Sequence, residues 1–214
     1  LREVEAEMAA LRRAEFGDEP AFGFSLLEDR AATPLTVPGP PLVLTRDQPV
    51  EITLVNRLPE ATAIHWHGME LESYYDGVHG WGGDGTRVTP MIGAGESFVV
   101  RFTPPRTGTF MYHTHLHDGK QVTSGLYGAM LVVDPGEPFD AAVDHALVLG
   151  RGGPQRDAPI FINDRQYPVM VWKAGARHRI RLINITPDDI VSVALVTAAA
   201  PVNWTPLTKD GAAV

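Results

Sequence analysis

The stretch Val50-Glu51-Ile52-Thr53-Leu54-Val55 alternates apolar and polar side chains and is rich in β-branched residues. Successive side chains of a strand point to opposite faces, so this pattern predicts a strand that is buried on one face. Similar runs recur on both sides of it, separated by turns rich in Gly and Pro. These further predicted strands cover residues 42–44, 63–67, 97–102, 109–115 and 129–133. Many short strands at such spacing indicate an all-β sandwich or barrel.

The N-terminal segment has a different composition. Residues 2–13 are rich in Ala, Glu, Leu and Arg, and Val4, Met8 and Leu11 fall at helical spacing. This spacing predicts a short amphipathic helix, so residues 1–20 are interpreted as a helical linker or N-terminal extension. The run from Gly77 to Gly95 lacks periodicity and predicts a long loop, which in a compact domain is functional or mobile.

Asp134-Pro135-Gly136-Glu137-Pro138 has the composition of a domain boundary. It divides the chain into a first domain at 21–136 and a second at 137–214. In the second half, strands are predicted at 146–149, 168–172, 177–183 and 190–196. These are fewer strands than a complete sandwich uses, so the second domain is expected to be partial. A half-sandwich exposes apolar faces and strand edges, which predicts that the polypeptide continues past Val214 or that another chain covers the open edge.

Composition excludes several classes of function. The 214-residue chain has a net charge of -8 and no basic stripe, which argues against a nucleic-acid partner. No apolar run approaches the roughly 18 residues that a membrane span needs. The absence of Cys excludes disulfides, thiolate catalysis and thiolate metal ligands within this sequence. The chain begins at Leu1 rather than Met, so the lack of a recognisable secretory signal says little about its compartment.

Five of the eight histidines fall in two clusters, His65-Trp66-His67-Gly68 and His113-Thr114-His115-Leu116-His117-Asp118. In a strand, residues i and i+2 project to the same face, so each pair points one way. If the two strands adjoin, the imidazoles of His65, His67, His113 and His115 converge. Neutral imidazole suits copper, zinc, iron and nickel. Buried His clusters without a metal are hard to satisfy with hydrogen bonds, so the pattern predicts a metal site.

The two His motifs resemble the copper motifs of the multicopper oxidases, the laccase-like family. The resemblance extends to the segments between and after them: Tyr75-Asp76-Gly77-Val78, Gly95-Glu96-Ser97-Phe98, Gln121 and Gly125-Leu126-Tyr127-Gly128-Ala129. Weaker similarity to the family's middle domain follows at 161–163, 179–184 and 209–212. The match runs from about Phe22 to the C-terminus.

The resemblance implies a fold and a set of ligands. It implies a cupredoxin-like Greek-key β-sandwich over 21–136, followed by a second, partial cupredoxin-like domain. It implies that His65 binds the type 2 copper, that His67 and His113 bind one copper of the type 3 pair, and that His115 binds the other. By resemblance, Asp76 assists proton delivery, which suits a carboxylate beside metal-bound water. From the residues alone, Asp76 is equally a turn residue before Gly77.

The resemblance also implies a function. Such a chain supplies half of a trinuclear copper site that reduces dioxygen to water while a phenolic, aromatic or metal-ion donor is oxidised. The family's type 1 copper needs a Cys, which this sequence lacks, and the His motifs that complete the cluster are not here. The chain alone is therefore expected to be catalytically incomplete and to need the rest of a polypeptide or another subunit. Homo-oligomer formation is left open, and the resemblance implies a periplasmic or extracellular location.

Two other functions remain open. The first is a non-catalytic copper-binding module, favoured by the missing Cys. The second is a zinc metallohydrolase, because 113–118 is superficially similar to a His-x-His-x-Asp-His motif with its last two residues transposed, but that fold needs alternating helices. His117 and His79 are interpreted as loop residues near the cluster, with roles as an additional ligand or as a gate left open. His145 and His178, without His neighbours in sequence, are interpreted as structural.

Overall fold

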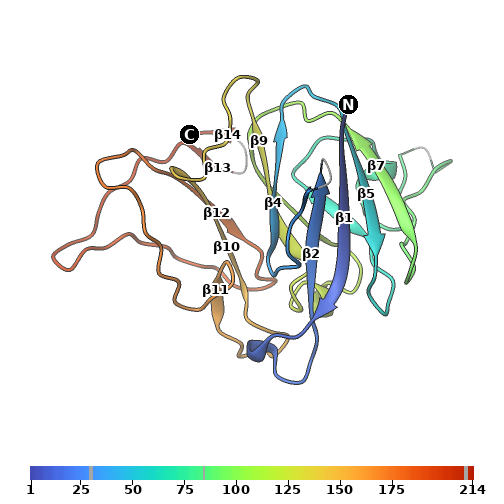
Figure 1. Cartoon of the computed structure of the whole chain (residues 1–214), viewed down its shortest axis with the longest axis horizontal. Coiled ribbons are helices and arrows are strands. Elements are labelled where there is room, and N and C mark those ends of the chain that lie inside the picture. Colours follow the sequence, from blue (N-terminus) through green and yellow to red (C-terminus); the bar gives the residue numbers. More distant parts are fainter. Residues whose placement is uncertain (29–30, 84, 210–211) are drawn as a thin grey trace.

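A computed structural model describes residues 1–28, 31–83, 85–209 and 212–214. Two sheets in this part of the chain face each other (Figure 1). The first has the order β3-β2-β1-β5-β7, and its strands are β1 (Arg2–Leu11), β2 (Ala21–Glu28), β3 (Ala31–Ala32), β5 (Val50–Asn56) and β7 (Ser97–Phe102). The second has the order β4-β9-β8-β6, and its strands are β4 (Gly39–Thr45), β6 (Ile64–His67), β8 (Gly108–Thr114) and β9 (Tyr127–Val133). Short helices lie in the connections: η1 (Ala14–Phe16), η2 (Ser73–Tyr75) and α1 (Asp118–Gln121).

The main core fills the space between these two sheets. Ile52 and Leu54 of β5 are almost fully buried, as their alternation predicts. Trp66 of β6 and Tyr112 of β8 enter the same core from the facing sheet. The phenol hydroxyl of Tyr112 donates to the carbonyl of Pro40 at 2.8 Å, which satisfies its polar end inside the core.

A third sheet covers the other face of β9. It has the order β11-β10-β12 and is built from β10 (Asp144–Arg151), β11 (Ile160–Ile162) and β12 (Arg179–Asn184). Tyr127 and Leu131 of β9 pack there against Val148 and Ile183. Strand β9 is thus buried on both faces, which explains its nearly continuous apolar sequence. Beyond it lie β13 (Thr208–Lys209) and β14 (Ala212–Ala213). The boundary at 136/137 and the partial nature of the second domain stay predictions.

The helix predicted for residues 2–13 is wrong. This segment forms β1, which pairs antiparallel with β2 and parallel with β5. Val4 and Met8 are spaced four residues apart, a spacing that a helix face and a strand face both satisfy. Ala6, buried between them, completes a period of two. Pairing on both edges outweighs the helix propensity of Ala and Glu.

Two predicted strands of the second half are also absent. Residues 168–172 and 190–196 have no strand beyond one isolated bridge at Val196. Val169, Val171 and Ile190 are more than nine-tenths exposed, so their β-branched side chains find no sheet to pack against. The loop predicted from Gly77 to Gly95 is irregular apart from one bridge at Ile92, and Asp84 lies outside the described residues, as does the Asp210-Gly211 pair near the C-terminus. No helix among the described residues is long and apolar enough to cross a membrane.

Candidate metal centre

Antiparallel pairing of β6 with β8 places the two His motifs side by side. The register sets His65 directly opposite His113 and Trp66 opposite Tyr112. Because Trp66 and Tyr112 point into the main core, His65, His67 and His113 project from the other face of the sheet. Alternation therefore gathers the imidazoles on one face, as the i, i+2 spacing predicts.

Three of the rings form a compact group. One ring nitrogen from each of His65, His67 and His113 lies within 4.8 Å of the other two. His115 follows the last residue of β8, and its backbone N–H donates to the carbonyl of Ala63 at 2.7 Å. This bond holds the end of the motif against β6, with the His115 ring centroid 5.4 Å from that of His65 and 6.2 Å from that of His113.

Hydrogen bonds to carbonyls fix which nitrogens carry protons. Nδ1 of His65 donates to the carbonyl of Asp76 at 2.7 Å, and Nδ1 of His113 donates to that of Thr114 at 2.7 Å. In both rings Nε2 is then the nitrogen with the lone pair, an arrangement typical of metal-bound histidines. Nδ1 of His67 lies 3.3 Å from Nε2 of His113. At metal–nitrogen distances of about 2.0–2.1 Å, two ligands at a tetrahedral angle have nitrogens about 3.3–3.4 Å apart. An all-imidazole donor set with this spacing fits a copper ion.

Charges around the metal-free site act differently on its members. Burial, together with the neighbouring rings of His65 and His67, lowers the pKa of His113 to about 4. Burial alone would also lower the pKa of His65, but hydrogen bonds to Asp76 and its charge outweigh burial and raise it. A carboxylate oxygen of Asp76 lies 3.3 Å from Nδ1 of His65. His113 is therefore neutral near pH 7, as a ligand must be.

The sequence has counterparts in known proteins. Residues 32–137 match a family model described as multicopper oxidase. The chain belongs to the multicopper oxidase family. It is 29% identical to the multicopper oxidase MmcO of Mycobacterium tuberculosis, over 79% of this chain and 41% of that protein. It is 30% identical to a copper resistance protein A homolog of Pseudomonas syringae pv. tomato, over 82% of this chain and 33% of that protein.

A solved multicopper oxidase shares the fold. The structure of a variant of McoA from the hyperthermophile Aquifex aeolicus superposes with a TM-score of 0.76, at 20% identity, over all of this chain and 49% of that one. This likeness confirms the predicted all-β, cupredoxin-like fold. The chain spans less than half the length of each of these multicopper oxidases and copper resistance proteins.

A buried polar network lies behind the His cluster of this multicopper oxidase chain. The side-chain carbonyl of Gln121 accepts hydrogen bonds from Thr62 at 2.9 Å and from Thr114 at 2.7 Å. Its amide donates to Glu60 and to the carbonyl of Ala61, both at 2.8 Å. The network ties the end of β8 to the segment before β6, so it holds the second His motif against the chain that leads into the first. The sequence indicates Gln121 through the resemblance, but no pattern points to Thr62 or Glu60.

The remaining predicted residues near the cluster have separate positions. His117 does not continue the strand, because its backbone is left-handed (φ 55°) and the helix α1 begins after it. His79 is exposed in the loop after Asp76. Neither ring belongs to the group of His65, His67 and His113, so their roles stay predictions. Tyr74 packs on Phe98 and beneath the guanidinium of Arg87, 3.8 Å from its ring.

His145 and His178, which have no His neighbours in sequence and are interpreted as structural, form a pair in the fold. Parallel pairing of β10 with β12 brings them together, and Nε2 of His145 lies 2.9 Å from Nδ1 of His178. They are 33 residues apart in sequence, so no local motif could reveal the pair.

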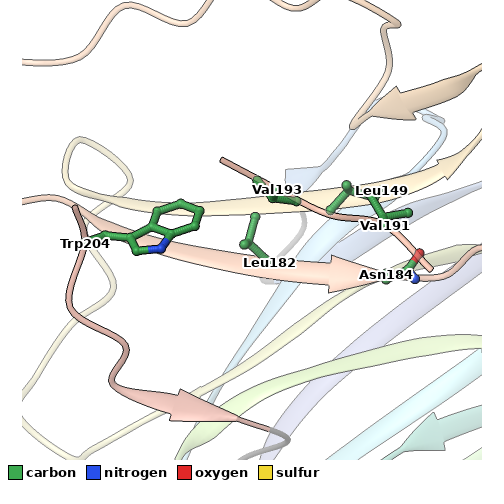
Figure 2. A pocket seen from close by; sticks show the side chains of 6 residues that line it. All are labelled: Leu149, Leu182, Asn184, Val191, Val193 and Trp204. Carbon is green, nitrogen blue, oxygen red and sulfur yellow. The ribbon is translucent and has the colours of Figure 1, made fainter. Parts of the chain in front are cut away.

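An apolar pocket of about 260 Å³ lies on the third sheet, away from the His motifs in sequence (Figure 2). Leu182 and Trp204 face it from two separate segments, with Val191 and Val193 from a third. Leu182, Val193 and Trp204 are each about two-fifths exposed. No histidine is among the described residues that line it.

Proposed function

We propose that this chain supplies half of the trinuclear copper site of a multicopper oxidase that reduces dioxygen to water. The observation that carries the proposal is the group of three imidazoles with nitrogens within 4.8 Å of one another, with the ring of His115 beside them. Each ring comes from a motif that resembles the family's copper motifs. The electron donor is proposed to be a phenol, a related aromatic compound or a metal ion.

We assign the four ligands by resemblance and geometry together. His67 and His113 hold one copper of the type 3 pair, which the 3.3 Å between their nitrogens supports. His115 holds the other. His65 holds the type 2 copper, and its Nδ1 hydrogen bond to Asp76 supports ligation through Nε2.

Asp76 is proposed to deliver protons to the site. Its carboxylate is about one-third exposed and lies 3.3 Å from Nδ1 of His65, so it faces both solvent and the ligand ring. A carboxylate in this position takes a proton from water and holds it beside the reacting centre. Bound copper supplies the redox chemistry of dioxygen reduction.

The rest of the oxidase is proposed to come from additional polypeptide or from another subunit, which includes a second copy as one option. No Cys is present to bind a type 1 copper, and the cluster needs ligands beyond these four. The partly exposed pocket of Leu182, Val193 and Trp204 supports the proposal that a further element covers the third sheet.

A non-catalytic copper-binding module is the second candidate, because the missing Cys removes the family's electron entry point from this sequence. Oxygen consumption by the completed protein with a phenolic donor separates the two candidates. The zinc metallohydrolase is disfavoured by the all-β fold, which lacks the alternating helices of that class in the described residues. A periplasmic or extracellular location remains a proposal from resemblance, testable by cell fractionation.

The function is tested by metal content. The chain is loaded with copper, passed over a desalting column, and analysed for bound metal. We expect retained copper in the wild-type chain and in His79→Asn, whose ring is exposed on the loop. We expect a loss in the double variant His67→Asn/His113→Asn. Equal copper in all three proteins, or zinc as the metal in protein isolated without added metal, would contradict the proposal.

A further inference from the structure

A second pair of histidines, His145 and His178, face each other with one ring nitrogen each. His145 lies in β10 and His178 directly precedes β12, and their facing nitrogens are 2.9 Å apart. The indole of Trp172 stacks on the His145 ring, with centroids 4.3 Å apart and planes inclined by 6°. Trp172 also stacks on His178 at 5.4 Å, so one indole supports both rings.

The hydrogen bonds of His178 leave its facing nitrogen without a proton. Nε2 of His178 donates to the carbonyl of Lys173 at 2.9 Å. In the neutral ring, Nδ1 therefore carries a lone pair directed at His145. A ring that donates one N–H to a backbone carbonyl and offers its other nitrogen is the usual arrangement of metal-binding histidines.

The groups around His145 and His178 leave both rings accessible to a cation. Burial lowers the pKa of His145, and the neighbouring His178 lowers it further, which favours the neutral ring that a metal ligand needs. The adjacent carboxylate of Asp144 is engaged by Arg181 through two hydrogen bonds of 2.7 Å. Both imidazoles are partly exposed, so an ion can reach them from solvent.

We propose that His145 and His178 bind a further, exchangeable copper ion, separate from the copper held by His65, His67, His113 and His115. The ion takes the place of the proton between the two rings, and that proton passes through water to Nδ1 of His145, so both rings stay neutral. Two imidazoles on one metal have nitrogens about 2.9 Å apart at a right angle and about 4.1 Å apart when opposed. Because the lone pair of His178 is directed at His145 across only 2.9 Å, an ion that enters between the two nitrogens requires the rings to separate by about 1 Å. With two protein ligands, the other positions are left to water, and the ion exchanges more readily than copper held by three or more imidazoles.

The test is a titration of the full chain with Cu(II), followed by equilibrium dialysis and metal analysis. We expect one weaker copper equivalent beyond those held by the main cluster. His145→Gln and His178→Gln should each lower the affinity of this weaker copper at least about tenfold, because losing even the hydrogen-bond partner of a ligand costs that much. His79→Gln should match the wild-type chain. An unchanged weaker equivalent in both variants, or an effect of only one of them, would overturn the proposal.

Two readouts keep the test decisive if a Gln variant misfolds. Copper bound beside Trp172 should quench the fluorescence of that indole. Trp172→Phe should therefore still bind the weaker copper ion, but the part of the fluorescence quenching that accompanies its binding should disappear. Pulsed electron paramagnetic resonance on the wild-type chain should show two imidazoles on the weaker copper. One imidazole or none, or a quenching phase that survives in Trp172→Phe, would count against the site.

Discussion

Nδ1 of His67 lies 3.3 Å from Nε2 of His113, although 46 residues separate the two in sequence. This separation is longer than a typical N–H···N hydrogen bond and matches two ligands of one metal ion. Both nitrogens belong to rings that project from the same face of the β6–β8 pair. The relationship therefore supports a shared ion.

If His67 and His113 bind the same ion, the effects of replacing them on copper affinity are non-additive. We expect His67→Asn and His113→Asn each to lower the affinity of that copper by at least about tenfold. The double variant should lose little more than either single one, because the ion is already displaced. Copper titrations of the four proteins measure this coupling. The pair His67 and His115, proposed to hold different ions, is the control and should give a smaller coupling. Additive losses for His67 and His113 would show that they do not share an ion.

The variant Asp76→Asn tests whether Asp76 delivers protons or only orients the ring of His65. The variant keeps the backbone carbonyl that holds Nδ1 of His65, so copper binding should change little. It removes the charge that raises the pKa of His65, so that pKa should fall in the metal-free chain. Histidine NMR titrations follow the pKa. In the completed oxidase, turnover should fall about 10²-fold or more, as general acid–base losses do. Unchanged turnover would leave Asp76 with only a turn role.

Acid should destabilise the metal-free chain through His113. Its pKa in the folded state is about 4, below the ordinary value of 6.5, so the unfolded chain binds this proton more readily. The stability that His113 contributes is present above about pH 6.5 and is lost as pH falls through 4. His65, whose pKa is raised, acts in the opposite direction and loses its contribution as pH rises.

We expect the metal-free chain to lose about 2 kcal/mol through His113 between pH 6.5 and 4. Denaturant unfolding at several pH values measures it. His113→Asn should flatten this part of the profile, whereas His79→Asn should leave it unchanged. Parallel profiles for all three proteins would refute the assignment.

The polar network behind the cluster should stabilise the domain. Thr114→Val removes the hydrogen bonds that the fully buried Thr114 hydroxyl makes with Thr62 and Gln121. Both of these side chains then lose a buried hydrogen-bond partner. We expect a cost of about 1–3 kcal/mol in the free energy of unfolding. Thr123→Val is the matched control, because that buried hydroxyl bonds only carbonyls of its own short helical turn. Its cost should be below about 1 kcal/mol. Equal costs would mean that the network contributes no more than local bonds.

Without Cys, the copper-loaded chain should show no intense blue absorption and no measurable dioxygen reduction by itself. The intense colour of a type 1 site needs a thiolate ligand. Visible absorption and an oxygen electrode measure both. Laccase-type turnover by this polypeptide free of any other chain would show that the missing ligands are not required.

Sequence patterns predicted the central strands and the common face of His65, His67 and His113, because period-two alternation determines which side chains share a face. They failed at β1, where Val4 and Met8 satisfy two periods and the pairing with β2 and β5 is long-range. The pairing of His145 with His178 was equally hidden, since it depends on the parallel register of β10 and β12. Thr62 and Glu60 join the polar network only through tertiary contacts, so no local signal marks them.

The most direct test of the central claim is anomalous X-ray scattering at the copper edge from crystals of the copper-loaded chain. We expect an anomalous peak about 2.0–2.1 Å from Nδ1 of His67 and Nε2 of His113. Further copper is expected beside Nε2 of His65 and beside the ring of His115. Ordered copper elsewhere with none at these four histidines would contradict the proposed metal centre.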